Sequence, residues 1–332
     1  MANNIAIYRE ADLHEVVALN RQMIDLMENL FVSLSEGRVV MPPILSLDLH
    51  DKNAEVDVKT AYVPGLDGFA VKISPGFFNN PQLGLASVNG LMVYFSAETG
   101  MVKAVFLDNG FLTDIRTAAA GGLATRHLAP SKVDTAGIIG TGVQARLQAK
   151  AAFLERPFSQ LMIHGRTPAH AEACAEDLSH YFGTLGVKVA VTIAEDCKKM
   201  VQESQLVITT TPARSALITA DCLHPNLHIT AMGSDAPGKR ELDQNVLEQA
   251  DQYYCDSLNQ TEILGELQGM AKADLTAPPI ELGVMIRDEL GRKNDQQMTI
   301  ADLTGTGAQD TAIANFAFHE LTKTAHGTLV EN

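Results

Sequence analysis

The sequence has few cysteines and no long apolar run. Its 332 residues include four cysteines, scattered along the chain at Cys174, Cys197, Cys222 and Cys255. They form no CxxC pair and no metal-binding spacing, so we expect reduced, buried thiols. No apolar run is long enough to cross a bilayer. The first ten residues have neither a basic leader nor an apolar core, which argues against a signal peptide and favours a cytoplasmic location.

Positive charge is also scarce. The chain has 25 Lys and Arg against 40 Asp and Glu, which gives a formal net charge of −15. Such a protein is repelled by phosphate backbones and anionic lipids, so we expect neither a nucleic acid nor a membrane as partner. An anionic small substrate is still compatible with this net charge, because a pocket can be locally basic. The length exceeds what one hydrophobic core usually supports and predicts two domains.

Several catalytic motifs are missing. The chain contains no HExxH, GxSxG or GKS/T string. His224 and His228 are four residues apart, but Pro225 between them prevents a helical pair of metal ligands. We therefore predict no metal and no covalent nucleophile.

The first third of the chain predicts a helix followed by a sheet. Apolar residues recur at three- and four-residue spacing over 11–35, which predicts an amphipathic helix ended by Gly37. Short apolar runs then alternate with Pro, Gly and Asn. The runs at 61–63, 68–73, 90–95 and 103–107 predict strands of one antiparallel or mixed sheet, with a hairpin turn at 97–100.

The remainder alternates strands with helices. An Ala-rich helix is predicted over 113–128, with Pro130 after its end. Strands are predicted at 135–139, 161–164, 187–193, 206–210, 228–232, 252–255 and 297–303, with helices such as 169–181 between them and a last helix over 306–321. This alternation predicts an α/β fold with a parallel sheet covered on both faces.

The first of these strands leads into a glycine-rich turn, Gly140-Thr141-Gly142-Val143-Gln144-Ala145. In a strand–turn–helix setting, GxGxxA predicts a dinucleotide-binding Rossmann unit. The first glycine permits the tight turn, Gly142 lets the backbone approach a pyrophosphate, and Ala145 keeps the helix close to the strand. The alternative is an ordinary βα turn that uses glycine for its geometry.

The end of the second strand bears on the choice between NAD and NADP. An NAD enzyme usually has Asp or Glu there for the ribose hydroxyls, whereas this chain has His164-Gly165-Arg166-Thr167. Arg166 and Thr167 suit a 2′-phosphate, so we favour NADP(H) over NAD(H); a plain surface arginine is the alternative. Thr210 and Thr211, at the end of the fourth strand, are a further expected wall of the cofactor site.

Four segments together resemble the ornithine cyclodeaminase/mu-crystallin family: 107–120 (LDNGFLTDIRTAAA), 140–145 (GTGVQA), 228–239 (HITAMGSDAPGK) and 260–266 (QTEILGE). The stretches 56–66 (VDVKTAYVPGL) and 72–78 (KISPGFF) look most similar to the branch of EutC-like proteins and iminosuccinate reductases. The resemblance implies a Rossmann domain (113–309) inserted in a mixed α+β substrate-binding and dimerisation domain (1–112 plus 310–332). It also implies a homodimer that acts on the C–N bond of small amino or imino acids.

The resemblance assigns roles to individual residues. Lys72 and Arg116 match the family's cations for the substrate carboxylate, and Asp235 matches an aspartate that faces the substrate nitrogen. These three are the expected catalytic residues, with Lys59 and Asn89 as further substrate contacts. The alternative for Asp235 is a turn residue that bonds its own backbone. Glu262 and Glu266 fit a solvated helix face, and the alternative is that one of them lines the cleft. The expected cofactor contacts are Gly140, Thr141, Gly142, Val143, Gln144, Arg166, Thr167, Thr210, Thr211, Met232, Gly233, Ser234 and Thr304.

Two departures from the family pattern weaken a literal ornithine cyclodeaminase assignment. A second arginine that the family usually carries is missing from 42–46 (PPILS), and Lys59 is the nearest candidate to replace it. A threonine usual before the 90–95 strand is missing as well. We therefore expect an NAD(P)H-dependent imino-acid reductase, with iminosuccinate as the first candidate substrate. An ornithine cyclodeaminase and a catalytically silent binding protein like mu-crystallin are the alternatives.

Overall fold

The computed structural model describes residues 4–331. The chain divides into two compact units: one comprises Met1–Leu19, Ser33–Arg116 and Thr306–Asn332, the other Asn20–Val32 and Thr117–Gly305. Helix α3 (Phe111–Leu128) carries the chain from the first unit into the second. The predicted division into 1–112 plus 310–332 and 113–309 stays a prediction about folding domains.

The first unit is built on one mixed sheet of seven strands in the order β17-β1-β6-β5-β4-β3-β2. The pairing of β1 with β6 is parallel and the other pairings are antiparallel. The strands are β1 (Asn4–Arg9), β2 (Leu45–Leu49), β3 (Ala54–Thr60), β4 (Gly68–Phe77), β5 (Leu91–Ser96), β6 (Val102–Leu107) and β17 (Thr328–Glu331). The predicted mixed sheet is confirmed, although β1, β2, β3 and β17 were not predicted.

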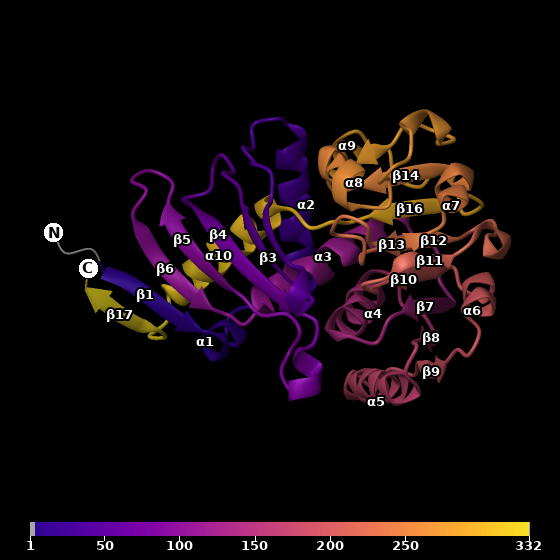
Figure 1. The fold of residues 1–332 in the computed structure, drawn as a ribbon, viewed down its shortest axis with the longest axis horizontal. Coiled ribbons are helices and arrows are strands. Elements are labelled where there is room, and N and C mark those ends of the chain that lie inside the picture. Colours follow the sequence, from indigo (N-terminus) through magenta and orange to yellow (C-terminus); the bar gives the residue numbers. More distant parts are fainter. Residues whose placement is uncertain (1–3, 332) are drawn as a thin grey trace. The chain divides into compact units, whose positions relative to one another are not determined.

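Helix α10 (Gly307–Leu321) covers one face of this sheet along β3, β4 and β5 (Figure 1). Its Thr311 hydroxyl accepts a hydrogen bond from the Ala70 amide at 3.1 Å and donates to the Ala61 carbonyl at 2.8 Å. Gly307 lies so close to β3 that a Cβ there would be 2.4 Å from the Thr60 carbonyl oxygen. The strand residues on this face, such as Lys72, are buried, whereas those on the opposite face remain partly exposed.

Two sequence predictions for the first third of the chain are corrected. The predicted single helix over 11–35 is two helices, α1 (Glu10–His14) and α2 (Arg21–Ser35). The Asn20 side chain starts α2 by accepting a hydrogen bond from the Met23 amide at 3.1 Å. The predicted strand at 61–63 is wrong: the strand here is β3, which was not predicted and covers Ala54–Thr60, and Tyr62 forms only an isolated bridge with Val40.

The second unit contains an eight-stranded sheet in the order β15-β14-β16-β12-β10-β7-β8-β9, in which every pairing is parallel. This confirms the predicted Rossmann-type α/β fold. The strands are β7 (Thr135–Ile139), β8 (Gln160–His164), β9 (Ala190–Ile193), β10 (Leu206–Thr209), β12 (His228–Ala231), β14 (Gln252–Cys255), β15 (Ile280–Glu281) and β16 (Thr299–Asp302). A separate parallel pair is formed by β11 (Arg214–Ile218) and β13 (Arg240–Leu242).

Helices connect these parallel strands, and Figure 1 shows them flanking the sheet. They are α4 (Val143–Glu155), α5 (Pro168–Thr184), α6 (Cys197–Glu203), α7 (Gln244–Gln249), α8 (Leu258–Leu264) and α9 (Leu282–Arg287). Short 3-10 turns lie at His50–Lys52, Asn80–Leu83, Ala220–Cys222 and Lys272–Asp274. Two apolar clusters contain the strand residues: Ile138 and Leu161 belong to one, Val207 and Ile229 to the other. This double covering explains why the parallel strands are short continuous apolar runs in the sequence.

The described residues contain no helix that is long and apolar enough to cross a membrane. The four cysteines are free thiols, and three of them are buried.

Candidate functional site

The glycine-rich turn joins β7 to the amino end of α4. Gly140 has φ +121°, and a Cβ there would lie 2.3 Å from the Thr210 hydroxyl oxygen, so only glycine fits this position. A Cβ at Gly142 would meet no described atom within 4 Å, so open space faces this residue. Gly142 is the N-cap residue of α4 and, because it has no side chain, cannot itself cap the first amides of the helix. The turn therefore presents an accessible helix amino end of the kind that binds phosphate groups.

Arg166 and Thr167 follow β8 and are both exposed. Thr167 is the N-cap residue of α5 and makes no side-chain cap hydrogen bond. Among residues 4–331, the Arg166 guanidinium forms no hydrogen bond or ion pair. Both side chains are thus accessible at the strand end where a Rossmann fold binds the adenosine ribose.

The loops after β10 and β12 carry Thr210, Thr211, Met232, Gly233 and Ser234. The Thr210 hydroxyl donates to the Ile139 carbonyl at 3.2 Å, next to the glycine-rich turn. The Ser234 hydroxyl interacts with the carbonyls of Lys239 and Leu264, at 2.9 and 3.2 Å. β10 and β12 are neighbours in the sheet, with Thr209 opposite Ala231, so these loops leave the same edge.

Two buried carboxylates that were not predicted hold the segments that follow these strands: Glu241 holds the loops after β10 and β12, and Asp256 holds the segment after β16. Glu241 accepts hydrogen bonds from Thr209, Thr211 and Gly233. Asp256 accepts from the Thr304 hydroxyl at 3.0 Å and from the Gly305 amide at 2.7 Å. Neither acid belongs to a recognisable local motif: Asp256 follows the run Tyr253-Tyr254-Cys255, whereas Glu241 follows the charged pair Lys239-Arg240.

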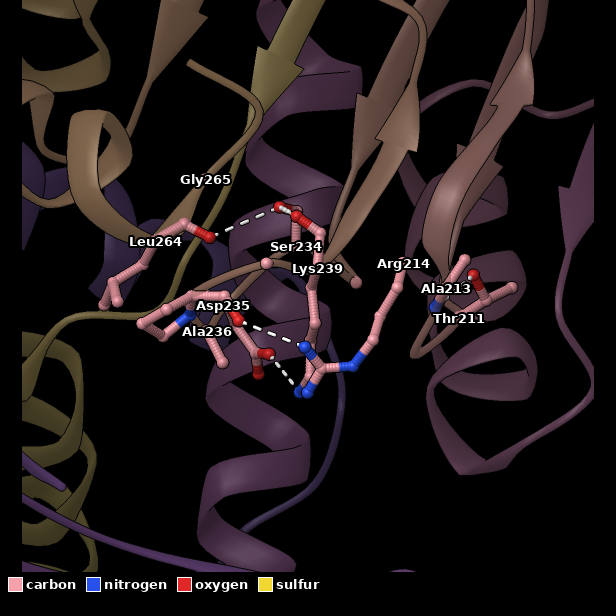
Figure 2. Close-up of polar contacts among 12 residues, drawn as sticks. Thr211, Ala213, Arg214, Ser234, Asp235, Ala236, Lys239, Leu264 and Gly265 are labelled. Carbon is pink, nitrogen blue, oxygen red and sulfur yellow. Dashed lines mark hydrogen bonds and ion pairs between the residues drawn. The ribbon is translucent and has the colours of Figure 1, made fainter. Parts of the chain in front are cut away.

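Asp235 lies in the loop between β12 and β13, in ion-pair contact with Lys239 (Figure 2). The Lys239 Nζ is 2.7 Å from Asp235 Oδ1, and the Lys239 side chain is only 8% exposed whereas that of Asp235 is 45% exposed. The same loop is closed by a hydrogen bond from the Lys239 amide to the Ala236 carbonyl at 3.2 Å. Asp235 is thus a half-exposed carboxylate neutralised by a buried lysine, a partner that was not predicted.

The predicted helix face of Glu262 and Glu266 is wrong. Helix α8 ends at Leu264, so Glu266 lies beyond it, and its side chain is buried. Its carboxylate accepts hydrogen bonds from the amides of Glu241 and Leu242, at 2.8 and 3.1 Å. Burial raises the pKa of Glu266 to about 7. Glu262 pairs with Lys272 instead.

A buried ionic cluster lies in the first unit. Lys72 on β4 and Arg116 on α3 both contact Asp310 on α10: the Lys72 Nζ is 3.0 Å from Asp310 Oδ2, and the Arg116 Nε is 2.9 Å from Oδ1. Lys59 on β3 is directly opposite Lys72 in the sheet and is also buried. We call Lys59, Lys72, Arg116 and Asp310 the basic cluster. Three predicted residues meet here, and Asp310 was missed.

The charges in the basic cluster perturb one another. Burial lowers the pKa of Lys72 to about 7, although Asp310 acts in the opposite direction. Burial also opposes ionisation of Asp310, but the charges of Arg116, Lys72 and Lys59 outweigh it and lower the pKa of that carboxyl. Three cations thus surround one carboxylate, which is an arrangement that favours binding of a further anion.

Asn89 does not join the basic cluster. It is exposed in the loop before β5, where its Oδ1 accepts a hydrogen bond from the Gly90 amide at 2.7 Å. The backbone amide of Asn89 donates a hydrogen bond to the Pro75 carbonyl at 3.0 Å. The side chain is therefore occupied with its own turn.

The two histidines near β12 are engaged in hydrogen bonds. His228 is buried and contacts the hydroxyls of Thr299 and Thr230 at 2.9 and 3.0 Å. His224 contacts the backbone carbonyls of Val201 and Ser204. Within the part of the chain that the structure describes, no group of three or more His, Cys, Asp or Glu residues is arranged to hold a metal ion.

The comparisons with known proteins agree with a dinucleotide-binding α/β enzyme. The model of the ornithine cyclodeaminase/mu-crystallin family matches residues 4–325. An uncharacterized cyclodeaminase of Sinorhizobium fredii is 47% identical over 331 residues, 98% of each chain. An alanine dehydrogenase of Archaeoglobus fulgidus is 31% identical over 321 residues, 94% of each chain.

A solved structure is similar over the whole chain. The iminosuccinate reductase of Paracoccus denitrificans in complex with NAD+ has a TM-score of 0.87 and 26% identity, covering 99% of this chain and 100% of that one. The chain belongs to the ornithine cyclodeaminase/mu-crystallin family. The proteins to which it is similar include pyrroline-2-carboxylate reductases of Bacillus and a lysine cyclodeaminase.

Proposed function

We propose that the protein is an NAD(P)H-dependent imino-acid reductase that converts the imine of a small 2-oxo acid into an L-amino acid. The observation that carries this proposal is the basic cluster, in which Lys72 and Arg116 share the Asp310 carboxylate and a third buried cation, Lys59, lies opposite Lys72. Such a cluster recognises the carboxylate of an imino acid. The similarity to alanine dehydrogenase and to iminosuccinate reductase supports the same reaction class.

The nicotinamide cofactor, when bound, supplies the hydride that reduces the imine carbon. The glycine-rich turn fits a pyrophosphate, because Gly140 tolerates no side chain and the space at Gly142 is open. Val143 begins α4, and the turn residues Thr141 and Gln144 are partly exposed beside it. Thr210, Thr211, Gly233 and Thr304 line the carboxyl ends of the neighbouring strands.

Arg116 binds the substrate carboxylate through its planar guanidinium, whose unused nitrogens suit two carboxylate oxygens. Lys72 adds a second positive charge beside it, and Lys59, buried opposite Lys72 in the sheet, adds a third. A dicarboxylic imine such as iminosuccinate, which yields aspartate, is therefore the first candidate substrate. The half-exposed Asp235 carboxylate stabilises the positively charged imine nitrogen; where the imine is neutral, Asp235 relays a proton from solvent water to that nitrogen.

Activity tests this proposal directly. Purified protein is incubated with NADH or NADPH and with oxaloacetate plus ammonium, pyrroline-2-carboxylate, or pyruvate plus methylamine. Consumption of reduced cofactor with at least one imine is expected. Ammonia release from ornithine without net NADH formation would instead identify a cyclodeaminase, and lack of turnover with tight NADPH binding a mu-crystallin-like binding protein.

The activity is expected to fall as the pH rises through about 7. Burial lowers the pKa of Lys72 to about 7, so its ammonium group loses its proton above that pH and attracts a carboxylate less strongly. The measurement is the ratio of kcat/KM of the wild type to that of Lys72→Met between pH 6 and 9. The ratio is expected to shrink with rising pH, whereas a constant ratio would assign the pH dependence to another group.

Cofactor preference depends on Arg166 in this proposal. Arg166→Ala is expected to raise KM for NADPH about tenfold, because a 2′-phosphate loses a charge-assisted partner, and to leave KM for NADH within about twofold. Steady-state kinetics with both cofactors decides this. Equal changes in both KM values would show that Arg166 does not distinguish the cofactors.

The protein is also proposed to form a homodimer through the face of the seven-stranded sheet that α10 leaves uncovered. Two cross-strand rows on that face are apolar: Leu45, Val58, Ile73 and Leu91 form one, and Ile7, Val105, Val93 and Val71 the other. All of these side chains are partly or fully exposed in one chain. A contiguous apolar face of this kind marks an interface, and a second copy matches it by symmetry. Sedimentation is expected to give twice the mass of one chain.

A further inference from the structure

Glu241 is a buried side chain of the second unit that carries a full set of hydrogen bonds. It is buried in β13, and its carboxylate accepts four hydrogen bonds. The donors are the Thr209 hydroxyl at 2.6 Å, the Thr211 amide at 2.6 Å, the Thr211 hydroxyl at 2.7 Å and the Gly233 amide at 2.7 Å. An ionised carboxylate suits this arrangement, because all four hydrogen-bond partners are donors.

These hydrogen bonds connect two loops that are separated in the sequence by β11 and β12. Thr211 follows β10 and Gly233 follows β12, two neighbouring parallel strands. The loops are in tight contact: a Cβ added at Gly233 would lie 2.0 Å from the Thr211 carbonyl oxygen and 2.6 Å from the Glu241 carboxyl carbon. Without Glu241, the amides of Thr211 and Gly233 would lose their shared acceptor.

The backbone of Glu241 is itself held in place by hydrogen bonds. Glu266 accepts hydrogen bonds from the amides of Glu241 and Leu242, and the Glu266 amide donates to Asp302 Oδ2 at 2.6 Å. Tyr253 donates to the same Asp302 oxygen. A continuous set of buried hydrogen bonds therefore extends from β16 to the loops after β10 and β12, and restricts where the Glu241 carboxylate can lie.

The position of these loops suggests what Glu241 does. In a Rossmann sheet the pyrophosphate binds at the turn after the first strand, and the adenosine ribose at the end of the second. Those strands are β7 and β8 here, whereas β10 and β12 lie on the other side of β7. The nicotinamide half of the cofactor therefore faces the loops that Glu241 ties together.

We infer that Glu241 is a positioning residue for the nicotinamide half of the cofactor, acting through the Thr211 and Gly233 loops. This inference rests on the proposed function, since it presumes a nicotinamide dinucleotide. Glu241 is fully buried and is hydrogen-bonded to both loops, so it acts on the cofactor only through them.

The test compares two ligands that share the adenosine diphosphate ribose part. NADH has the nicotinamide and ADP-ribose lacks it; NADPH and 2′-phospho-ADP-ribose replace them if NADPH binds more tightly. Glu241→Gln keeps the size of the side chain but turns one acceptor into a donor that faces other donors. We expect Kd for NADH to rise about tenfold or more and Kd for ADP-ribose to stay within about twofold of the wild type.

Two further variants keep the test decisive. Thr209→Val removes the hydroxyl that supports Glu241 from within the sheet and preserves side-chain shape, so it measures the same effect if Glu241→Gln does not fold. A rise of about threefold in Kd for NADH alone is expected from it. Glu248→Gln is the matched control, since Glu248 is exposed on α7, and should change neither Kd.

The outcomes separate this inference from the proposed function. If the wild type binds neither NADH nor NADPH, the proposed function fails. If the wild type binds NADH but Glu241→Gln and Thr209→Val weaken NADH and ADP-ribose equally, or weaken neither, then Glu241 serves the fold alone and the inference is overturned.

Discussion

Replacing Asp310 by asparagine is expected to lower the free energy of unfolding by about 3–5 kcal/mol, because it leaves buried cations without their counter-charge. Asp310 is fully buried, with Lys72 at 3.0 Å on one oxygen and Arg116 at 2.9 Å on the other. Asparagine keeps the shape and one acceptor oxygen but carries no charge. The cost is expected to be large since Lys72 and Arg116 are themselves almost fully buried and cannot be solvated in place.

Urea unfolding at pH 6, where Lys72 is protonated, measures this loss, with protein concentration held constant. Asp51→Asn is the matched control, because Asp51 pairs with Lys52 at 3.3 Å on the surface, with a side chain that is 76% exposed. A change below about 1 kcal/mol is expected there. Equal destabilisation by both variants would contradict the role assigned to Asp310.

The pH dependence of this difference has a defined sign. The pKa of Asp310 is lowered from its ordinary value of 3.8, so its charge stabilises the fold above that pH and this contribution is lost as the pH falls through the lowered value. The gap between wild type and Asp310→Asn is therefore expected to be full at about pH 5–6, where Lys72 is protonated, and to shrink under strongly acidic conditions. A gap that grows towards acid would mean that the asparagine acts by packing instead.

The parallel sheet was predictable because its signals are local. Each buried strand is a short apolar run, and the glycine-rich turn at Gly140 combines a steric requirement with a recognisable spacing. The break between α1 and α2 was missed because the apolar spacing continues through it. Only the side chain of Asn20, bonded to the Met23 amide, marks the start of the second helix.

The residues missed in the candidate site depend on contacts between distant parts of the chain. Asp310 meets Arg116 across 194 positions, and nothing near Asp310 in the sequence indicates a partner. Glu241 accepts hydrogen bonds from Thr209 and Thr211, which lie 32 and 30 positions earlier in the sequence. Glu266 had a local signal, its spacing from Glu262, but the end of α8 at Leu264 removed the face that this spacing implies.

Replacing Arg116 by methionine is expected to lower kcat/KM for an imino acid by about 10²–10³, because truncating one member of a buried charge pair costs about 2–5 kcal/mol. Methionine retains most of the apolar length of arginine but offers no donor to a carboxylate. The effect is expected in KM and kcat together, since the carboxylate both anchors the substrate and orients its imine carbon.

Three comparisons make this result specific. Arg116→Lys keeps the charge but not the planar fork, and an intermediate loss of about tenfold is expected. Arg38→Met removes an arginine whose side chain is 69% exposed and should leave kcat/KM unchanged. Kd for NADH should also be unchanged in Arg116→Met, because the proposed cofactor residues all belong to the second unit whereas Arg116 belongs to the first. If cofactor affinity falls as much as kcat/KM does, Arg116 supports the fold or the cofactor, and the carboxylate must be bound elsewhere.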